Sequence, residues 1–111
     1  MKIAEIKDNE QYKELLKLSF VKPVVLMVEM DGCIACYFAQ DKFKSISAEF
    51  PEVYPAKMMK DLFYNNVSHL RFTYFPEFLL LTKGMFTHQA FGNNEAKIRG
   101  MFAEAKDCLN V

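Results

Sequence analysis

The stretch that decides the fold is residues 24–36, which read VVLMVEMDGCIAC. Residues 24–28 form a continuous apolar run rich in β-branched side chains, which is typical of a strand buried on both faces. After a short Asp-Gly turn, apolar side chains recur every three to four residues from Cys33 to Pro51. The sequence therefore predicts a central strand that leads into a helix opening at two cysteines.

On the N-terminal side of this stretch the pattern predicts one strand and one helix. Residues 2–7 alternate weakly in polarity, as an edge strand does. Asp8 offers a capping carboxylate, and residues 9–19 place apolar side chains at helical spacing between Lys and Glu. Pro23 ends this helix before the central strand begins.

On the C-terminal side, strands and helices alternate again. The pattern predicts, in order, a strand at 53–59, a short helix at 65–70, a strand at 78–82, a tight turn at Lys83-Gly84, a strand at 85–91 and a last helix capped by Asn93 or Asn94. The complete order is β-α-β-α-β-α-β-β-α, with parallel crossovers first and an antiparallel hairpin at the end. We therefore expect an α/β protein with a central mixed sheet and helices on both faces.

Length, composition and charge limit the classes of protein to consider. The 111 residues fit a single domain, 1–111, and 51% hydrophobic with 25% charged side chains is an ordinary globular composition. Lys and Arg number 14 and Asp and Glu also number 14, so the formal net charge is zero. Without a positive field to hold phosphate groups, nucleic acid is not an expected partner.

The number of cysteines and the length of the apolar segments indicate in which cellular compartment the protein is expected. Three cysteines are too few for a disulfide scaffold, and an odd number is untypical of a fully paired secreted protein. Residues 1–8 show no signal-peptide pattern, and the most apolar stretch, 24–28, is far shorter than the roughly 20 residues of a membrane span. We expect a cytoplasmic protein without a membrane partner.

The segment Cys33-Ile34-Ala35-Cys36 carries the chemical signal. Residues i and i+3 of a first helical turn are close enough to form and break a disulfide without backbone rearrangement. Cys33 would lie at the positive end of the helix dipole, which favours its thiolate form and makes it the nucleophile. Cys36, one turn further along, would be the resolving thiol that releases a mixed disulfide.

Two other interpretations of this pair remain open at this point. A structural zinc site needs two further ligands, but the candidates Cys108, His69 and His88 are scattered along the chain, so no metal is expected. Alternatively, the two residues are core cysteines without chemistry, since free cysteine is often simply buried.

The chain resembles the thioredoxin family along nearly its whole length. The apolar strand 24–28 leads into the Cys33-x-x-Cys36 helix, Phe75-Pro76 precedes the fourth strand, Lys83-Gly84 forms the hairpin turn and Phe91-Gly92 precedes the last helix. The resemblance implies the thioredoxin fold, with a cis peptide bond between Phe75 and Pro76.

The resemblance also implies where a substrate binds. The loop that ends at Pro76 would face the first cysteine, and the backbone of Phe75 would pair with an extended substrate segment. Tyr74 flanks this loop, while Gly32 and Ile34 flank the cysteine. We expect these five residues to form the substrate-binding surface.

The sequence departs from the family pattern around the cysteines. Gly32 stands where thioredoxins carry Trp, and Ile34-Ala35 replaces Gly-Pro. The buried carboxylate of the family falls on Met27, although Lys57 matches the lysine that approaches it. Glu29 lies two residues further along the same side of the strand, so we hypothesise that it accepts the proton of the resolving cysteine. The alternative is a strand-end glutamate that points into solvent or pairs with Lys57.

Together these observations predict a thiol–disulfide oxidoreductase that reduces protein disulfides at Cys33 and Cys36 without a cofactor. A thioredoxin-reductase-type protein would supply the electrons, and the chain is expected to act as a monomer. Glu29 and Asp31 favour a mildly reducing potential, because negative charge near the first cysteine stabilises the disulfide over the dithiol. The alternative is a thioredoxin-like binding module with weak or no redox activity. A glutathione-dependent role is disfavoured, because no basic cluster lies near residues 74–77.

Overall fold

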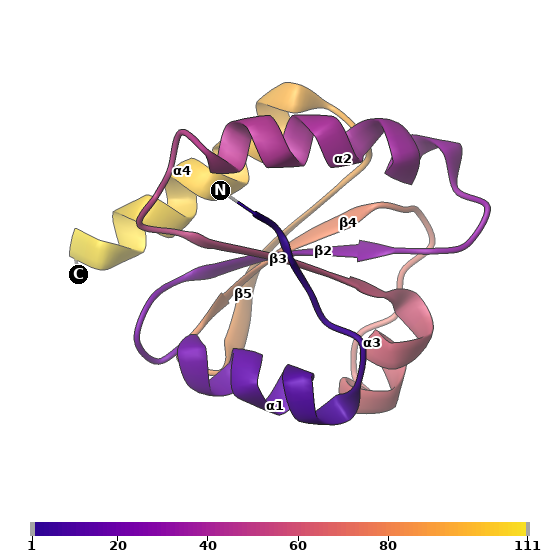
Figure 1. Ribbon diagram of the computed structural model, residues 1–111, viewed down its shortest axis with the longest axis horizontal. Helices are drawn as coiled ribbons and strands as arrows, with labels where there is room; N and C mark the ends of the chain where they lie inside the picture. The colour runs from indigo at the N-terminus through magenta and orange to yellow at the C-terminus, as the bar shows by residue number, and fades with distance from the viewer. Residues whose placement is uncertain (1, 111) are drawn as a thin grey trace.

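The computed structural model describes residues 2–110 and has helices on both faces of one mixed sheet (Figure 1). Its elements are, in chain order, β1 (Ala4–Glu5), α1 (Asn9–Leu18), β2 (Val24–Glu29), α2 (Ile34–Ser47), β3 (Tyr54–Met59), α3 (Lys60–Asn66), β4 (Glu77–Thr82), β5 (Met85–Phe91), α4 (Glu95–Asp107) and a short 3₁₀ turn at Cys108–Asn110. This order confirms the α/β arrangement predicted from the sequence.

The sheet has the strand order β1-β3-β2-β4-β5, so β2 is central as predicted. β2 runs parallel to β3 and antiparallel to β4, and β4 and β5 form the C-terminal hairpin. β1 is an edge strand, but it pairs only at Ala4 and Glu5 and is shorter than the predicted 2–7. Pro55 of β3 pairs with Val25 of β2, and β1 pairs only with Ala56 and Lys57. No residue of β1 therefore lies opposite Pro55, which has no N–H to donate.

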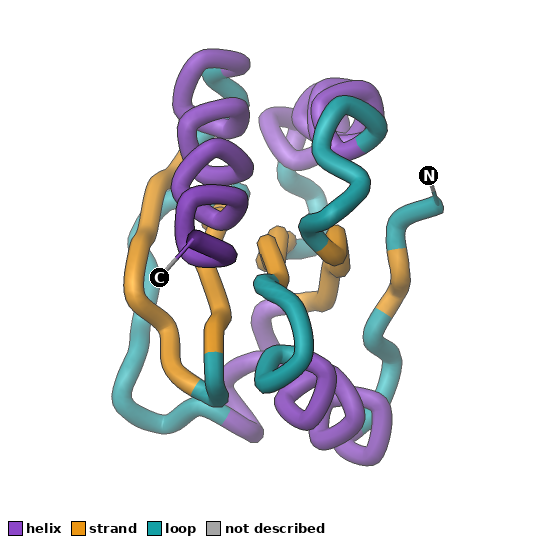
Figure 2. The backbone as a smooth tube through the Cα atoms, turned by 90° about the vertical axis from the view of Figure 1, so that its left-hand side faces the viewer, coloured by secondary structure: helices purple, strands orange, loops and turns teal. Residues whose placement is uncertain are grey.

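The side chains of β2 contribute alternately to two apolar cores, one on each face of the sheet. Val24, Leu26 and Val28 pack under α1 and α3, whereas Val25 and Met27 pack under α2 and α4. In Figure 2 the orange strands lie between purple helices above and below, which is the layering that these two cores require. Phe63 anchors the first core, and Phe43 and Phe102 anchor the second.

Helix α3 lies earlier in the chain than the sequence pattern predicts. It spans Lys60–Asn66 and follows β3 directly, whereas a helix was predicted at 65–70, so that prediction is wrong. The reason is tertiary: one turn after β3, Phe63 is fully buried against the core. Asn65 and Asn66 are weak helix formers, and Val67 already has an extended backbone.

The hairpin turn between β4 and β5 confirms the prediction at Lys83-Gly84. Both residues have left-handed backbones, with φ of 51° for Lys83 and 76° for Gly84, which matches the twist of a two-residue hairpin. A Cβ at Gly84 would also lie 3.2 Å from the ring of Phe20, a tight contact that this 66% exposed ring could relieve by a small shift.

One buried carboxyl group lies at the start of β4. Glu77 is only 3% exposed, and its Oε1 accepts a hydrogen bond of 3.1 Å from the side-chain amide of Gln89 on β5. Burial raises the pKa of Glu77 to about 7, and the hydrogen bond from Gln89 offsets only part of that rise. Glu77 is therefore protonated in the folded protein over a pH range in which an unfolded glutamate is ionised.

The sign of this pKa shift predicts how stability depends on pH. Between pH 4.5 and about 7 the unfolded chain releases the proton of Glu77 and the folded chain keeps it, so rising pH lowers the free energy of unfolding. Glu77→Gln keeps the acceptor for Gln89 but cannot ionise. Each pKa unit corresponds to about 1.4 kcal/mol. Because the protein and solvent relax around the ionised carboxylate, the effect is smaller than the full shift, and we expect the variant to be more stable than the wild type by on the order of 1–2 kcal/mol above pH 7.

Urea denaturation across this pH range measures the effect. The two proteins should have nearly equal stability below pH 4.5 and diverge as the pH rises to about 7. Glu14→Gln, which alters an exposed carboxylate of α1, is the matched control and should not change the slope. A pH-independent difference between wild type and Glu77→Gln would contradict the prediction.

Candidate active site

The two cysteines lie where the central strand passes into α2. β2 ends at Glu29, and Gly32 turns the chain with a φ of 70°, a left-handed backbone that glycine adopts without strain. Cys33 is the N-cap of α2, and it is joined to Cys36 by a disulfide with a Cα–Cα distance of 5.2 Å. The predicted strand, turn and cysteine pair are therefore present at the predicted place.

The two sulfur atoms differ in exposure and in environment. Cys33 is partly exposed, whereas Cys36 is 3% exposed beneath it. The backbone N–H of Cys36 donates a hydrogen bond of 3.1 Å to the Sγ of Cys33. Because this N–H is one of the unpaired donors at the start of α2, it stabilises negative charge on the outer sulfur. An incoming disulfide can reach Cys33 but not Cys36.

The loop before β4 faces the outer cysteine. The peptide bond between Phe75 and Pro76 is cis, as the resemblance implies, and the carbonyl oxygen of Phe75 lies 3.7 Å from the Sγ of Cys33. In the dithiol state the thiol of Cys33 can donate to this oxygen. Pro76 is buried, Phe75 is half-buried and Tyr74 is 60% exposed, so only part of this predicted surface is open to a partner.

Aromatic side chains extend the surface around this loop. Tyr74 stacks on Phe91 at the end of β5, with ring centroids 5.1 Å apart, and the Nζ of Lys97 lies 5.0 Å from the centroid of Phe91. On the other side of the disulfide, Ile34 is 73% exposed. Phe91 is a surface residue that was not predicted from the sequence, although its position before Gly92 is part of the family resemblance.

Glu29 lies beside the cysteines and does not point into solvent. It is 6% exposed, its Oε1 accepts a hydrogen bond of 2.8 Å from Gln40, and its Oε2 lies 3.8 Å from the Nζ of Lys57. The predicted pairing with Lys57 is therefore present, and the solvent-facing alternative is wrong. Met27, at the place of the family's acid, is 1% exposed and belongs to the core under α2 and α4.

A cavity of about 390 Å³ connects Glu29 with both cysteines. Its walls also contain Gln40 of α2 and the apolar side chains of Met30, Ile34, Tyr37 and Met59. Sequence reasoning missed Gln40. Its position four residues after Cys36 was the available signal, because residues at that spacing lie on the same side of a helix. The arrangement places an acid, a buried thiol and an exposed thiol around one space.

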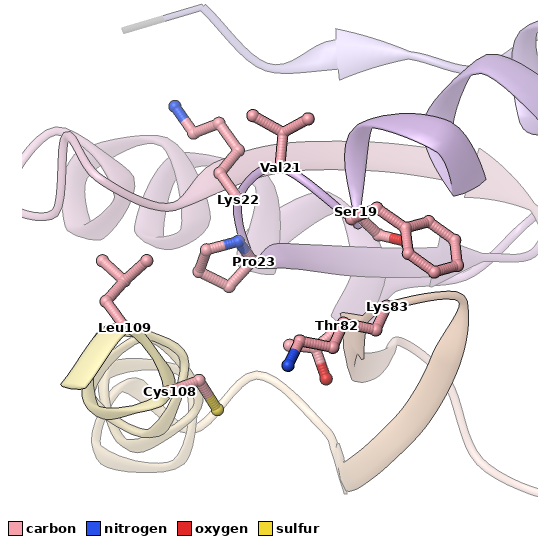
Figure 3. A pocket seen from close by; sticks show the side chains of 9 residues that line it. Ser19, Val21, Lys22, Pro23, Thr82, Lys83, Cys108 and Leu109 are labelled. Atoms are coloured by element: carbon pink, nitrogen blue, oxygen red, sulfur yellow. The ribbon is translucent and has the colours of Figure 1, made fainter. Parts of the chain in front are cut away.

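The remaining cysteine and the histidines lie away from this site. Cys108 lines a separate cavity of about 250 Å³ at the opposite end of β2, next to Pro23, Thr82 and Leu109 (Figure 3). His88 lies on β5, 3.7 Å from Glu104. Within residues 2–110, no three His, Cys, Asp or Glu side chains are grouped as metal ligands, so the zinc interpretation finds no ligand set there.

Comparison with known proteins identifies the fold. No protein-family model matches the sequence, and no curated protein sequence matches it. Among solved structures, the Fasciola hepatica thioredoxin superposes with a TM-score of 0.81 at 20% identity, covering 93% of this chain and 99% of the other. A Schistosoma mansoni thioredoxin gives 0.81 at 21% identity, covering 93% and 94%. The thioredoxin NaTrxh from Nicotiana alata gives 0.81 at 16% identity, covering 93% and 91%.

These similarities extend over nearly the whole chain at low identity, so they show a shared architecture. The cis bond before Pro76 and the Cys33–Cys36 disulfide at the start of α2 are observed independently in this chain. The protein therefore has the thioredoxin fold, with a disulfide-forming Cys-x-x-Cys pair at the end of its central strand.

Proposed function

We propose that this protein reduces disulfide bonds of other proteins by dithiol–disulfide exchange. The observation that carries the proposal is the asymmetric disulfide at the start of α2, in which Cys33 is accessible and Cys36 is buried beneath it. A pair with this geometry cycles between dithiol and disulfide without rearranging the backbone.

Cys33 is the proposed nucleophile. Its sulfur accepts the N–H of Cys36 and caps a helix of 14 residues, so the helix dipole favours the thiolate over the thiol. The thiolate attacks one sulfur of a substrate disulfide. A bond forms between Cys33 and that sulfur, the substrate disulfide breaks, and the first substrate thiolate leaves.

Cys36 is the proposed resolving thiol. After losing its proton, Cys36 attacks the Sγ of Cys33, the mixed disulfide breaks and the second substrate thiolate departs. Two electrons have then passed from the dithiol to the substrate, and the protein holds the Cys33–Cys36 disulfide. A thioredoxin-reductase-type dithiol donor returns two electrons and restores the dithiol.

The substrate would bind along the cis-proline loop. The backbone next to Phe75 can pair with an extended segment, and its carbonyl oxygen already lies 3.7 Å from the sulfur of Cys33. Tyr74 and Ile34 offer exposed apolar contacts on the two sides of the disulfide, and Gly32 leaves the side that thioredoxins cover with Trp open. A bulky polypeptide substrate therefore has room to approach Cys33.

Glu29 is the proposed proton acceptor for Cys36. Both line the cavity of about 390 Å³, which is large enough to hold water molecules that relay a proton. Gln40 donates a hydrogen bond to Oε1 of Glu29, and Lys57 forms an ion pair with Oε2 at 3.8 Å, so both oxygens of the carboxylate have a partner. This arrangement replaces the carboxylate that the family has at the position of Met27.

Exposed apolar side chains on α2 favour one second candidate. Ile34, Tyr37 and Phe38 are 73%, 70% and 55% exposed, and they occupy i, i+3 and i+4 positions on the helix surface. Such a ridge is also expected of a binding module that holds partner proteins without turnover. Redox measurements separate the two candidates.

For the setting of this activity we propose a reducing, cytoplasmic compartment and a monomeric protein that binds neither nucleic acid nor membranes. Within residues 2–110, no helix combines the length and the apolar character needed to cross a bilayer. The balanced charge of the chain and its small, odd number of cysteines, three, support the proposal.

The first prediction of this proposal concerns the redox equilibrium of the cysteine pair. A titration in dithiothreitol buffers, read by alkylation mass shift in a Cys108→Ser background, should show one two-electron transition near about −270 mV. The same protein should reduce insulin disulfides with dithiothreitol as electron donor. Cys33→Ser should abolish this turnover, and Cys36→Ser should accumulate a mixed disulfide with substrate.

Other results of the redox titration and of the insulin assay would contradict this proposal. A transition above about −180 mV would move the protein to the oxidases or isomerases. A pair that never closes, or closes without any insulin turnover, would leave the binding module as the function.

The second prediction concerns Glu29→Gln. Without its acceptor, Cys36 should resolve the mixed disulfide roughly 100-fold more slowly near neutral pH. The deficit should shrink above about pH 8.5, where a free thiol ionises without help. Stopped-flow measurement of substrate thiol release across pH tests this, and Glu104→Gln on α4 is the exposed control. An unchanged rate and pH profile would remove Glu29 from the mechanism.

A further inference from the structure

We propose that Gln40 is a positioning residue that holds the Glu29 carboxylate toward Cys36. This inference rests on the proposed function, because it concerns the proton that leaves the resolving thiol. Gln40 touches neither sulfur through a hydrogen bond in the structure, so its effect must pass through Glu29.

The hydrogen bond between Gln40 and Glu29 connects α2 with the end of β2. Nε2 of Gln40 donates to Oε1 of Glu29 at 2.8 Å, a short bond to a charged acceptor. Gln40 is half-buried and stands four residues after Cys36, so the helix that carries the resolving thiol also carries the donor. A movement of the Glu29 carboxylate toward Lys57 would stretch or break this bond.

Glu29 lies between two cavities, which is why its orientation matters. One is the cysteine cavity of about 390 Å³, and the other, of about 210 Å³, is lined by Lys57, Met58 and Leu62. Only Glu29 and Met59 line both. Gln40, which lines the cysteine cavity, contacts Oε1, whereas Lys57, which lines the second cavity, contacts Oε2.

Without Gln40, the ion pair with Lys57 is the remaining contact of the Glu29 carboxylate, and it draws the carboxylate away from the cysteines. The Nζ of Lys57 is 3.8 Å from Oε2, and a glutamate held by that contact alone can rotate about its side-chain bonds toward the second cavity. Water in the cysteine cavity would then have no carboxylate oxygen to receive a proton. Groups that orient metal ligands carry effects of about 10- to 100-fold, and we expect an effect of that order for a group that orients a proton acceptor.

The chemical step affected is the resolution step alone. The proton of the Cys36 thiol passes to Glu29, the Cys36 thiolate attacks Cys33, and the bond between Cys33 and its adduct breaks with release of a thiolate. Attack by Cys33 on the substrate comes earlier and needs no proton transfer to Glu29. A positioning role for Gln40 therefore predicts a defect in the second phase of the reaction and none in the first.

A single-turnover reaction with dithiobis(nitrobenzoic acid) separates these phases. The reduced Cys108→Ser protein releases one thionitrobenzoate when Cys33 attacks the reagent and a second when Cys36 resolves the adduct. We expect Gln40→Met to slow the second release about 10-fold near neutral pH and to leave the first unchanged. The defect should shrink as the pH rises above about 8.5, the pKa of a free thiol, because hydroxide then takes over the role of the acceptor.

A double-mutant cycle tests whether Gln40 acts through Glu29. In a Glu29→Gln background, Gln40→Met should cause no further slowing, because the group that it positions is no longer an acceptor. Lys57→Met should have a smaller effect than Gln40→Met, since its contact is longer and lies on the far side of the carboxylate. Gln11→Met, on α1, is the matched control and should react like the wild type.

The outcomes that overturn the inference are distinct from those that overturn the proposed function. Equal second-phase rates for Gln40→Met and the wild type, an equal slowing of both phases, or additive slowing in the Glu29→Gln background would each remove the positioning role. If Gln40→Met does not fold, as judged by circular dichroism, Gln40→Ala provides the same test with a good helix former. The reagent reacts with any accessible dithiol, so the result does not depend on turnover of a protein substrate.

Discussion

Burial of β2 on both faces is the constraint on which the rest of the structure depends. All six residues of the strand are buried, with β3 on one side and β4 on the other. Alternate side chains enter two different cores, so the strand can neither slip in register nor rotate without exposing apolar surface at about 25 cal/mol per Å². Because the strand is fixed in this way, its C-terminal end has a defined position. The turn at Gly32 then places the cysteine pair at the start of α2.

The elements near β2 were predictable because their signals are local. An apolar run, a glycine turn and a cap each depend on a few neighbouring residues, and the structure confirms Asp8 and Asn94 as N-caps through bonds to Gln11 and Lys97. The cis bond at Pro76 came from the family resemblance rather than from any local pattern. The position of α3 was predicted wrongly because it is set by the burial of Phe63 beneath the sheet. This is a tertiary contact, and helix propensities carry no information about it.

The polar partners at the site could not be predicted for a related reason. The hydrogen bond from Gln40 to Glu29 joins a helix to a strand end, and the bond from Gln89 to Glu77 joins two strands. Both hydrogen bonds depend on the register between strands and on the position of the helix along the sheet. The spacing of side chains in the sequence alone does not determine either. Glu77 reads as an ordinary polar residue at a strand start, and only its enclosure in the sheet gives it a pKa of about 7.

The position of Glu29, two residues beyond Met27, bears on why its carboxylate has a hydrogen bond from Gln40. A carboxylate at Met27 would be enclosed on every side by the core, with Phe78 opposite on β4 and Lys57 opposite on β3. Glu29, two residues further along the same face, stands at the lip of the cysteine cavity instead, diagonal to Lys57. At that place the carboxylate lines two cavities instead of a closed apolar core, so polar partners hold its side chain. Gln40 supplies from α2 a restraint on Glu29 that the core would supply to a carboxylate at Met27. Under the proposed function, the displaced acid and the glutamine of the helix therefore belong to one arrangement.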